Sequence, residues 1–173
     1  MRAVSVMLGL TLALVLQTTL ARYIARGAVG LDLVLVAVVF IALAFGPVTG
    51  MLCGAAAGLM QDVLVASPVI GIAGLAKTIV GFLAGLIGTQ LIVVQPIPRF
   101  VVFLGATALH AVIFIGLYTL LDLRQFGTGS ALVNGVAAQA AANAVVGVVA
   151  FQLVELVPGA VERRKATRHR IRR

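Results

Sequence analysis

The side chains of this chain that could do chemistry are few, and they lie inside apolar stretches. Asp62, Lys77 and His110 each have mainly apolar or small neighbours. Ionisable groups in such surroundings are energetically costly, so they usually face the interior of a helix bundle and pair with one another. Their chemistry is therefore either that of a structural ion pair or that of a relay that moves protons or ions.

Asp62 and Lys77 flank the turn predicted at Ser67-Pro68. Asp62 lies about one and a half helical turns before it and Lys77 about two and a half turns after it, and the long stem of lysine can extend toward the nearer end. We therefore predict an interhelical ion pair between Asp62 and Lys77. A proton or ion relay is the alternative, and it is the weaker one because one acid and one base make a poor relay chain.

His110 lies in the middle of a predicted span, and no second His, Cys or carboxylate has metal-ligand spacing with it. We predict that it is a hydrogen-bonded packing group. Motifs of enzymes are missing, because the chain has no P-loop, no HExxH, no GxSxG and no paired carboxylates at short spacing. The chain is therefore predicted to have no catalytic residues, no metal ion and no cofactor.

A pair of amides, Gln139 and Asn143, stands at helical i and i+4 positions between Gly135 and Gly147. Amide side chains on a helix with small neighbours favour hydrogen bonds between helices. The alternative is a polar ligand pocket, to which Asn134 would add a third amide.

Small residues at four-residue spacing form two ridges that would position these groups. Positions four apart lie on one face of an α-helix, and a glycine face lets another helix approach closely in lipid. The ridges therefore predict close packing inside the protein, or a face for a partner helix. The first consists of Gly46, Gly50, Gly54, Gly58 and Asp62, and the second of Lys77, Gly81 and Gly85.

The composition indicates an integral membrane protein. The chain has 173 residues, of which 62% are hydrophobic and 10% charged, whereas an average soluble domain is about 45–50% apolar and about 25% charged. We predict an all-α protein with about six transmembrane helices in one bundle over residues 1–160, followed by a basic tail over 161–173. Six spans of about 20 residues leave no room for a soluble catalytic or ligand-binding domain.

Breaks in the apolar pattern divide the chain into these spans. Gly46-Pro47 splits an uncharged run that is too long for one upright span, because proline disfavours helix in the residue before it. Ser67-Pro68 and Gln95–Arg99 are predicted to be further loops. The predicted spans cover residues 3–20, 31–45, 48–65, 69–94, 100–121 and 132–156.

The basic residues predict the orientation in the membrane. With an even number of spans, the side that holds both termini carries nine of the thirteen basic residues, and the other side carries three. The positive-inside rule then places both termini in the cytoplasm. Seven of the nine lie in the tail, which is predicted to be a topology anchor. Contact of the tail with anionic lipid or an acidic partner is the alternative, and contact with nucleic acid is not expected.

A pattern of glycines, prolines and aspartates covers roughly residues 31–90. It runs from Leu31-Asp32-Leu33 through Gly46-Pro47, Gly50 and Gly58-Leu59-Met60-Gln61-Asp62 to Pro68, Gly71, Leu75 and Gly81-Phe82-Leu83-Ala84-Gly85. This pattern resembles that of the MreD family of rod shape-determining proteins. The chain departs from the family in three places: Gly30-Leu31 replaces a proline before the aspartate, Pro68 and Gly71 are one residue further apart, and Phe82 replaces a tyrosine.

The resemblance implies a small protein of the bacterial inner membrane without catalytic activity. It would be a scaffold of the cell-elongation complex, binding MreC directly and, through MreC, the MreB filament and the cell-wall synthases. The family fold is similar to that of the membrane subunits that capture vitamins for energy-coupling-factor transporters, so a substrate-capture subunit is the alternative function. Besides MreC and the lipid bilayer, a second copy of the chain is left open as a partner.

Overall fold

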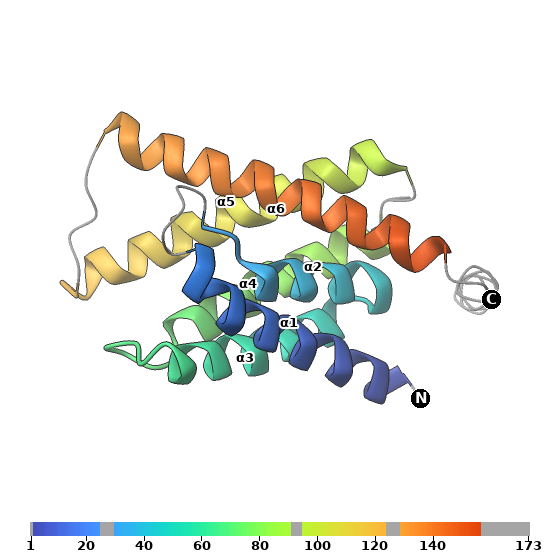
Figure 1. Cartoon of the computed structure of the whole chain (residues 1–173), viewed down its shortest axis with the longest axis horizontal. Coiled ribbons are helices and arrows are strands. Elements are labelled where there is room, and N and C mark those ends of the chain that lie inside the picture. Colours follow the sequence, from blue (N-terminus) through green and yellow to red (C-terminus); the bar gives the residue numbers. More distant parts are fainter. Residues whose placement is uncertain (1, 25–29, 91–94, 124–128, 157–173) are drawn as a thin grey trace.

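The described part of the chain forms six helices in a computed structural model (Figure 1). The structure describes residues 2–24, 30–90, 95–123 and 129–156, apart from the side chains of 2–5 and 20–24, and this part contains no strand. The predicted all-α fold is thereby confirmed, while the tail predicted for 161–173 lies outside the described residues. The helices are α1 (Arg2–Ile24), α2 (Leu33–Phe45), α3 (Pro47–Leu64), α4 (Ile72–Gln90), α5 (Pro96–Leu120) and α6 (Ser130–Leu156).

Consecutive helices run in opposite directions along the long axis, so the start of α1 and the end of α6 lie at the same end of the molecule (Figure 1). The central helix is α2, which contacts each of the other five. It has 13 residues, seven of them buried, and a length of about 20 Å. Such a short apolar helix is stable here because its neighbours enclose it.

Proline and glycine set two of the helix boundaries. Gly46, with a φ of 96°, ends α2 and precedes α3, whose first residue is Pro47. A positive φ of this size favours glycine, which has no Cβ. The helix α5 begins at Pro96, so the loop predicted at Gln95–Arg99 is wrong beyond its first residue. A proline suits this position because the first helical turn needs no N–H from it.

The early start of α5 brings Arg99 into the bundle instead of a loop. Arg99 is 2% exposed, and its guanidinium pairs with Glu155 near the end of α6. The guanidinium also lies 4.5 Å from the centre of the Phe151 ring. A buried charge needs such partners, so these contacts tie the start of α5 to the end of α6.

The contact between α3 and α4 is built on glycine backbone. A Cβ atom at Gly50 would overlap the backbone of Gly81, and one at Gly54 would overlap the backbone of Lys77. A Cβ atom at Gly58 would lie 2.6 Å from the carbonyl oxygen of Ala73. Only residues without a side chain permit this approach, so the ridge from Gly50 to Gly58 faces α4.

The other glycines of the two predicted ridges and of α6 have different surroundings. Gly85 packs on the first residue of α3, and Gly147 packs on the ring of Phe103. Gly46 is the junction between α2 and α3 and is not part of a helix face. A Cβ atom at Gly135 would have no neighbour within 4 Å, so this position is open.

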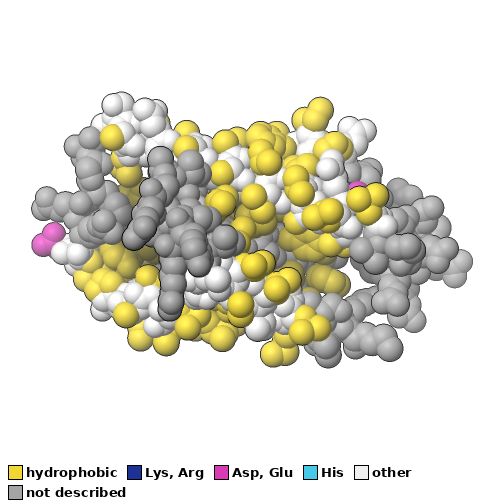
Figure 2. All heavy atoms as spheres, viewed as in Figure 1, with side chains coloured by type: hydrophobic (Ala, Val, Ile, Leu, Met, Phe, Trp, Pro, Cys, Tyr) yellow, Lys and Arg dark blue, Asp and Glu magenta, His cyan; other side chains and the backbone are white. Residues whose placement is uncertain are grey.

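The most exposed side chains of the protein are apolar, and several of its charged and polar side chains are buried within a mainly apolar core. Leu120, Val112 and Met7 are 83%, 69% and 68% exposed, whereas Lys77 and Asn143 are 1% and 0% exposed. Figure 2 shows apolar side chains spread over one face, with acidic ones only near its ends and no Lys, Arg or His visible among the described residues. The helices α4, α5 and α6 are long and apolar enough to cross a membrane. This distribution is that of a protein in lipid.

The glycine contact predicts a position-dependent effect of adding one methyl group. Gly54→Ala should lower the free energy of unfolding by about 1–3 kcal/mol, because the new Cβ meets backbone that cannot turn aside. The matched control is Gly105→Ala on α5, where nothing lies within 4 Å, and it should be neutral or stabilising by up to about 1 kcal/mol. Equilibrium unfolding in detergent measures both, and equal effects at the two sites would contradict this packing.

Candidate functional site

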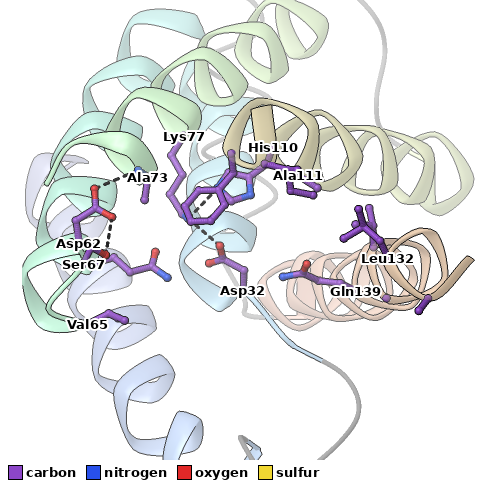
Figure 3. A pocket seen from close by; sticks show the side chains of 16 residues that line it. Asp32, Asp62, Val65, Ser67, Ala73, Lys77, His110, Ala111, Leu132 and Gln139 are labelled. Atoms are coloured by element: carbon purple, nitrogen blue, oxygen red, sulfur yellow. Dashed lines mark hydrogen bonds and ion pairs between the residues drawn. The ribbon is translucent and has the colours of Figure 1, made fainter. Parts of the chain in front are cut away.

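An ion pair between Asp32 and Lys77 lies at the centre of the bundle. The Nζ of Lys77 on α4 is 2.7 Å from Oδ2 of Asp32, which precedes α2, and 3.3 Å from Nε2 of His110 on α5. All three residues are buried, and Figure 3 shows their side chains meeting. Because an ammonium group can only donate, Nε2 of His110 accepts its hydrogen bond, and the imidazole is neutral.

Asp32 is held in place by groups from three helices. Its Oδ1 accepts a hydrogen bond of 2.9 Å from the backbone N–H of Leu35, which makes it the N-cap of α2. Gln17 of α1 donates to the carbonyl before Asp32, at 2.9 Å, and accepts from the N–H after it, at 2.7 Å. The N–H of Asp32 itself donates to Oδ1 of Asn143 on α6, at 3.1 Å. These contacts hold the Asp32 carboxylate in position independently of Lys77.

Asn143 extends this network to α5. Its Nδ2 donates to Oγ1 of Thr107 at 3.3 Å, and Thr107 donates to the carbonyl oxygen of Phe103 at 2.9 Å. The His110 ring stacks on Phe114 with 5.7 Å between ring centres. The polar centre, which we define as Gln17, Asp32, Lys77, Thr107, His110 and Asn143, thus joins five of the six helices.

The predicted ion pair between Asp62 and Lys77 is wrong. Oδ2 of Asp62 accepts hydrogen bonds from the backbone N–H groups of Gly71, at 2.8 Å, and Ala73, at 3.1 Å. Oδ1 lies 3.4 Å from the hydroxyl of Ser67, which donates to it. Asp62 therefore caps the start of α4 across the turn, where a carboxylate is favoured by the unpaired N–H groups and the helix dipole.

A cavity of about 440 Å³ lies beside the polar centre, at the end of the bundle that holds the turn between α3 and α4 (Figure 3). Gln139 lines it and points toward Asp32 and Lys77 from α6. The Oε1 atom of Gln61 on α3 is buried and has no hydrogen-bond partner. The lining comprises Asp32, Gln61, Asp62, Val65, Ser67, Ala73, Lys77, His110, Ala111, Phe114, Ile115, Ala131, Leu132, Gly135, Val136 and Gln139.

The amides of α6 take different places. Asn143 is buried in the polar centre, Gln139 lines the cavity, and Asn134 is exposed. Among the described residues, no group of three or more His, Cys, Asp or Glu is arranged to hold a metal ion. The arrangement can therefore fix five helices in register and can accept a small polar group in the cavity.

The charge pattern of the sequence did not identify Asp32 as the partner of Lys77. Asp32 stands immediately before an uncharged apolar run, which is the position of an N-cap. That signal places its carboxylate at the start of α2, but it does not say which cation on another helix reaches it. The partner depends on the tertiary packing of α2 against α4.

The polar centre predicts a coupling between Asp32 and Lys77. Lys77→Met alone leaves a buried carboxylate unpaired and should lower the free energy of unfolding by about 3–5 kcal/mol. Asp32→Asn keeps an oxygen for the cap but leaves the ammonium unpaired, with a similar loss. The double variant should lose clearly less unfolding free energy than the sum of the losses in the two single variants.

The same unfolding experiment contains its control. Lys77→Met combined with Asp62→Asn should be additive, because Asp62 binds backbone N–H groups and not the ammonium. Coupling of Lys77 to Asp62 in place of Asp32 would contradict the assignment of the pair.

Comparison with known proteins identifies the family. Neither curated proteins nor solved structures give a match. The family model described as rod shape-determining protein MreD matches residues 1–157, which includes all six helices. The family is one of membrane proteins, in agreement with the buried polar centre and the apolar exterior. The chain belongs to the family of the rod shape-determining protein MreD.

Proposed function

We propose that this protein is a non-enzymatic scaffold of the bacterial rod complex, which binds MreC directly and, through it, the MreB filament and the cell-wall synthases. Membership of the MreD family is the observation that carries this proposal. The polar centre supports it, because Asp32 and Lys77 bind each other and hold helices together. A scaffold needs such a bundle of fixed shape.

The proposed setting is the cytoplasmic membrane, with six spans and both termini in the cytoplasm. The alternating directions of the six helices support an even number of spans (Figure 1). The excess of basic residues at the end with the termini supports the orientation. In this orientation the turn between α3 and α4, and the cavity beside it, face outward.

The proposed binding face for the transmembrane helix of MreC is on α6. Asn134, Ala138 and Ala141 follow one another at i, i+4 and i+7 and are all exposed. Small residues allow a second helix to approach in lipid, and an asparagine among them can donate and accept hydrogen bonds across the contact. The ridge of α3 does not serve this purpose, because α4 covers Gly50, Gly54 and Gly58.

The alternative function is the capture of a vitamin for a transporter of the energy-coupling-factor type. The cavity beside the polar centre is the observation that favours it. Purification from native membranes separates the two functions, because the scaffold should bring MreC with it and the capture subunit should bring a vitamin and a pair of transport ATPases.

A substitution on the proposed face of α6 should weaken binding of MreC and leave the fold intact. Ala141→Leu should reduce the amount of MreC that co-purifies with the protein by about tenfold, which corresponds to about 1.4 kcal/mol of binding free energy. Its unfolding free energy should stay within about 0.5 kcal/mol of the wild type, since the site is exposed.

The matched control is Ala56→Leu, the same change at an exposed position of α3. It should leave both MreC co-purification and stability unchanged. Full MreC recovery with Ala141→Leu would disprove the α6 face, and absence of MreC from the wild-type complex would disprove the scaffold itself.

A further inference from the structure

We propose that the cavity beside the polar centre binds a primary ammonium group carried on a short apolar stem. The inference does not rest on the scaffold function, because it concerns the cavity alone. Its volume of about 440 Å³ is within the range of small-molecule sites. Its lining combines one unsatisfied acceptor, a net negative charge and an apolar wall.

The Oε1 atom of Gln61 is a hydrogen-bond acceptor without a donor. Gln61 lines the cavity, and its Oε1 atom is buried and has no hydrogen-bond partner. A buried acceptor without a donor is destabilising, so a ligand that donates to Gln61 would relieve this state. Gln139 faces the same space from α6 and adds a second amide (Figure 3).

The charged side chains that line the cavity favour a cationic ligand. The carboxylates of Asp32 and Asp62 and the ammonium of Lys77 all line the cavity, and His110 is neutral because it accepts from Lys77. Two negative charges and one positive charge leave the lining with one net negative charge. An anionic ligand such as a phosphate is disfavoured by this balance, and a cationic donor is favoured.

The apolar part of the lining favours a ligand with a carbon stem. Phe114 and Ile115 on α5 and Leu132 and Val136 on α6 form the wall opposite α3 and α4. Such a wall suits the carbon stem of an amine and not a fully hydrated ion. Two sources share this chemistry: the ethanolamine headgroup of a phospholipid, and a free alkylamine. The position of the cavity near the ends of the helices is accessible to either.

The first test compares lipids that differ in the ammonium group. The purified full chain is mixed with phosphatidylethanolamine, phosphatidylcholine or phosphatidylglycerol, and retained lipid is measured by native mass spectrometry. Phosphatidylcholine has no N–H to donate, and phosphatidylglycerol has no cation. We expect phosphatidylethanolamine to be retained about tenfold more than either, the effect of one hydrogen bond to a charged group.

The second arm distinguishes the source of the amine. Butylammonium chloride is titrated against the chain in detergent without phosphatidylethanolamine, and its melting temperature is followed. If butylammonium raises the melting temperature and the three lipids are retained equally, the site binds a free amine. If phosphatidylethanolamine is retained selectively, the site binds the lipid headgroup. Equal retention of the three lipids together with no stabilisation by butylammonium overturns the proposal.

Two changes of Gln61 locate the site. Gln61→Leu should abolish the selectivity or the stabilisation, while the matched change Gln152→Leu, at an exposed position far along α6, should preserve it. Gln61→Lys supplies a tethered ammonium, so it should raise the melting temperature and abolish binding of the added amine. Unchanged ammonium binding in both Gln61 variants overturns the proposal.

None of these measurements involves MreC, so their failure is distinct from failure of the scaffold function.

Discussion

The rest of the bundle depends on the need to pair one buried ammonium group. Lys77 is 1% exposed and meets the carboxylate of Asp32 at 2.7 Å. A buried ion pair contributes little net stability, but removing one partner is strongly destabilising. Any arrangement that moves α2 along α4 would separate the two charges. The pair therefore specifies register, and Gln17 and Asn143 extend that constraint to α1 and α6.

The helices are held together by two kinds of contact. Between α3 and α4 the backbones touch through Gly50, Gly54 and Gly81, so dispersion contacts dominate there. Among the other helices, polar side chains make contacts in addition to an apolar core that includes Leu35, Phe103 and Phe151. Asp62 adds a polar contact to the first of these two kinds, because its carboxylate caps α4 at the turn that follows α3. The result is a bundle of defined shape with an apolar exterior and a polar cluster inside a mainly apolar core.

Periodic sequence patterns were sufficient to indicate the helices and the glycine face of α3, because both follow from spacing along one helix. They left open whether this face meets α4 or a partner helix. The break at Gly46-Pro47 is equally local. The partner of Lys77 is not local. Proximity in sequence favours Asp62, yet the backbone N–H groups of Gly71 and Ala73 already occupy that carboxylate. Arg99 was misplaced for a related reason, since a proline that can end a helix can also begin one.

The central claim is that the charges of Asp32 and Lys77 are structural and do not move protons or ions. Rod shape in cells that rely on this protein tests it most directly, with Asp32→Asn, Lys77→Met and the double variant produced at equal membrane levels. We predict round cells for each single change and restored rods for the double variant, which keeps no buried charge in the pair. Round cells for a double variant that is folded and present at the wild-type level would contradict the claim, because they would show that the charges themselves are required.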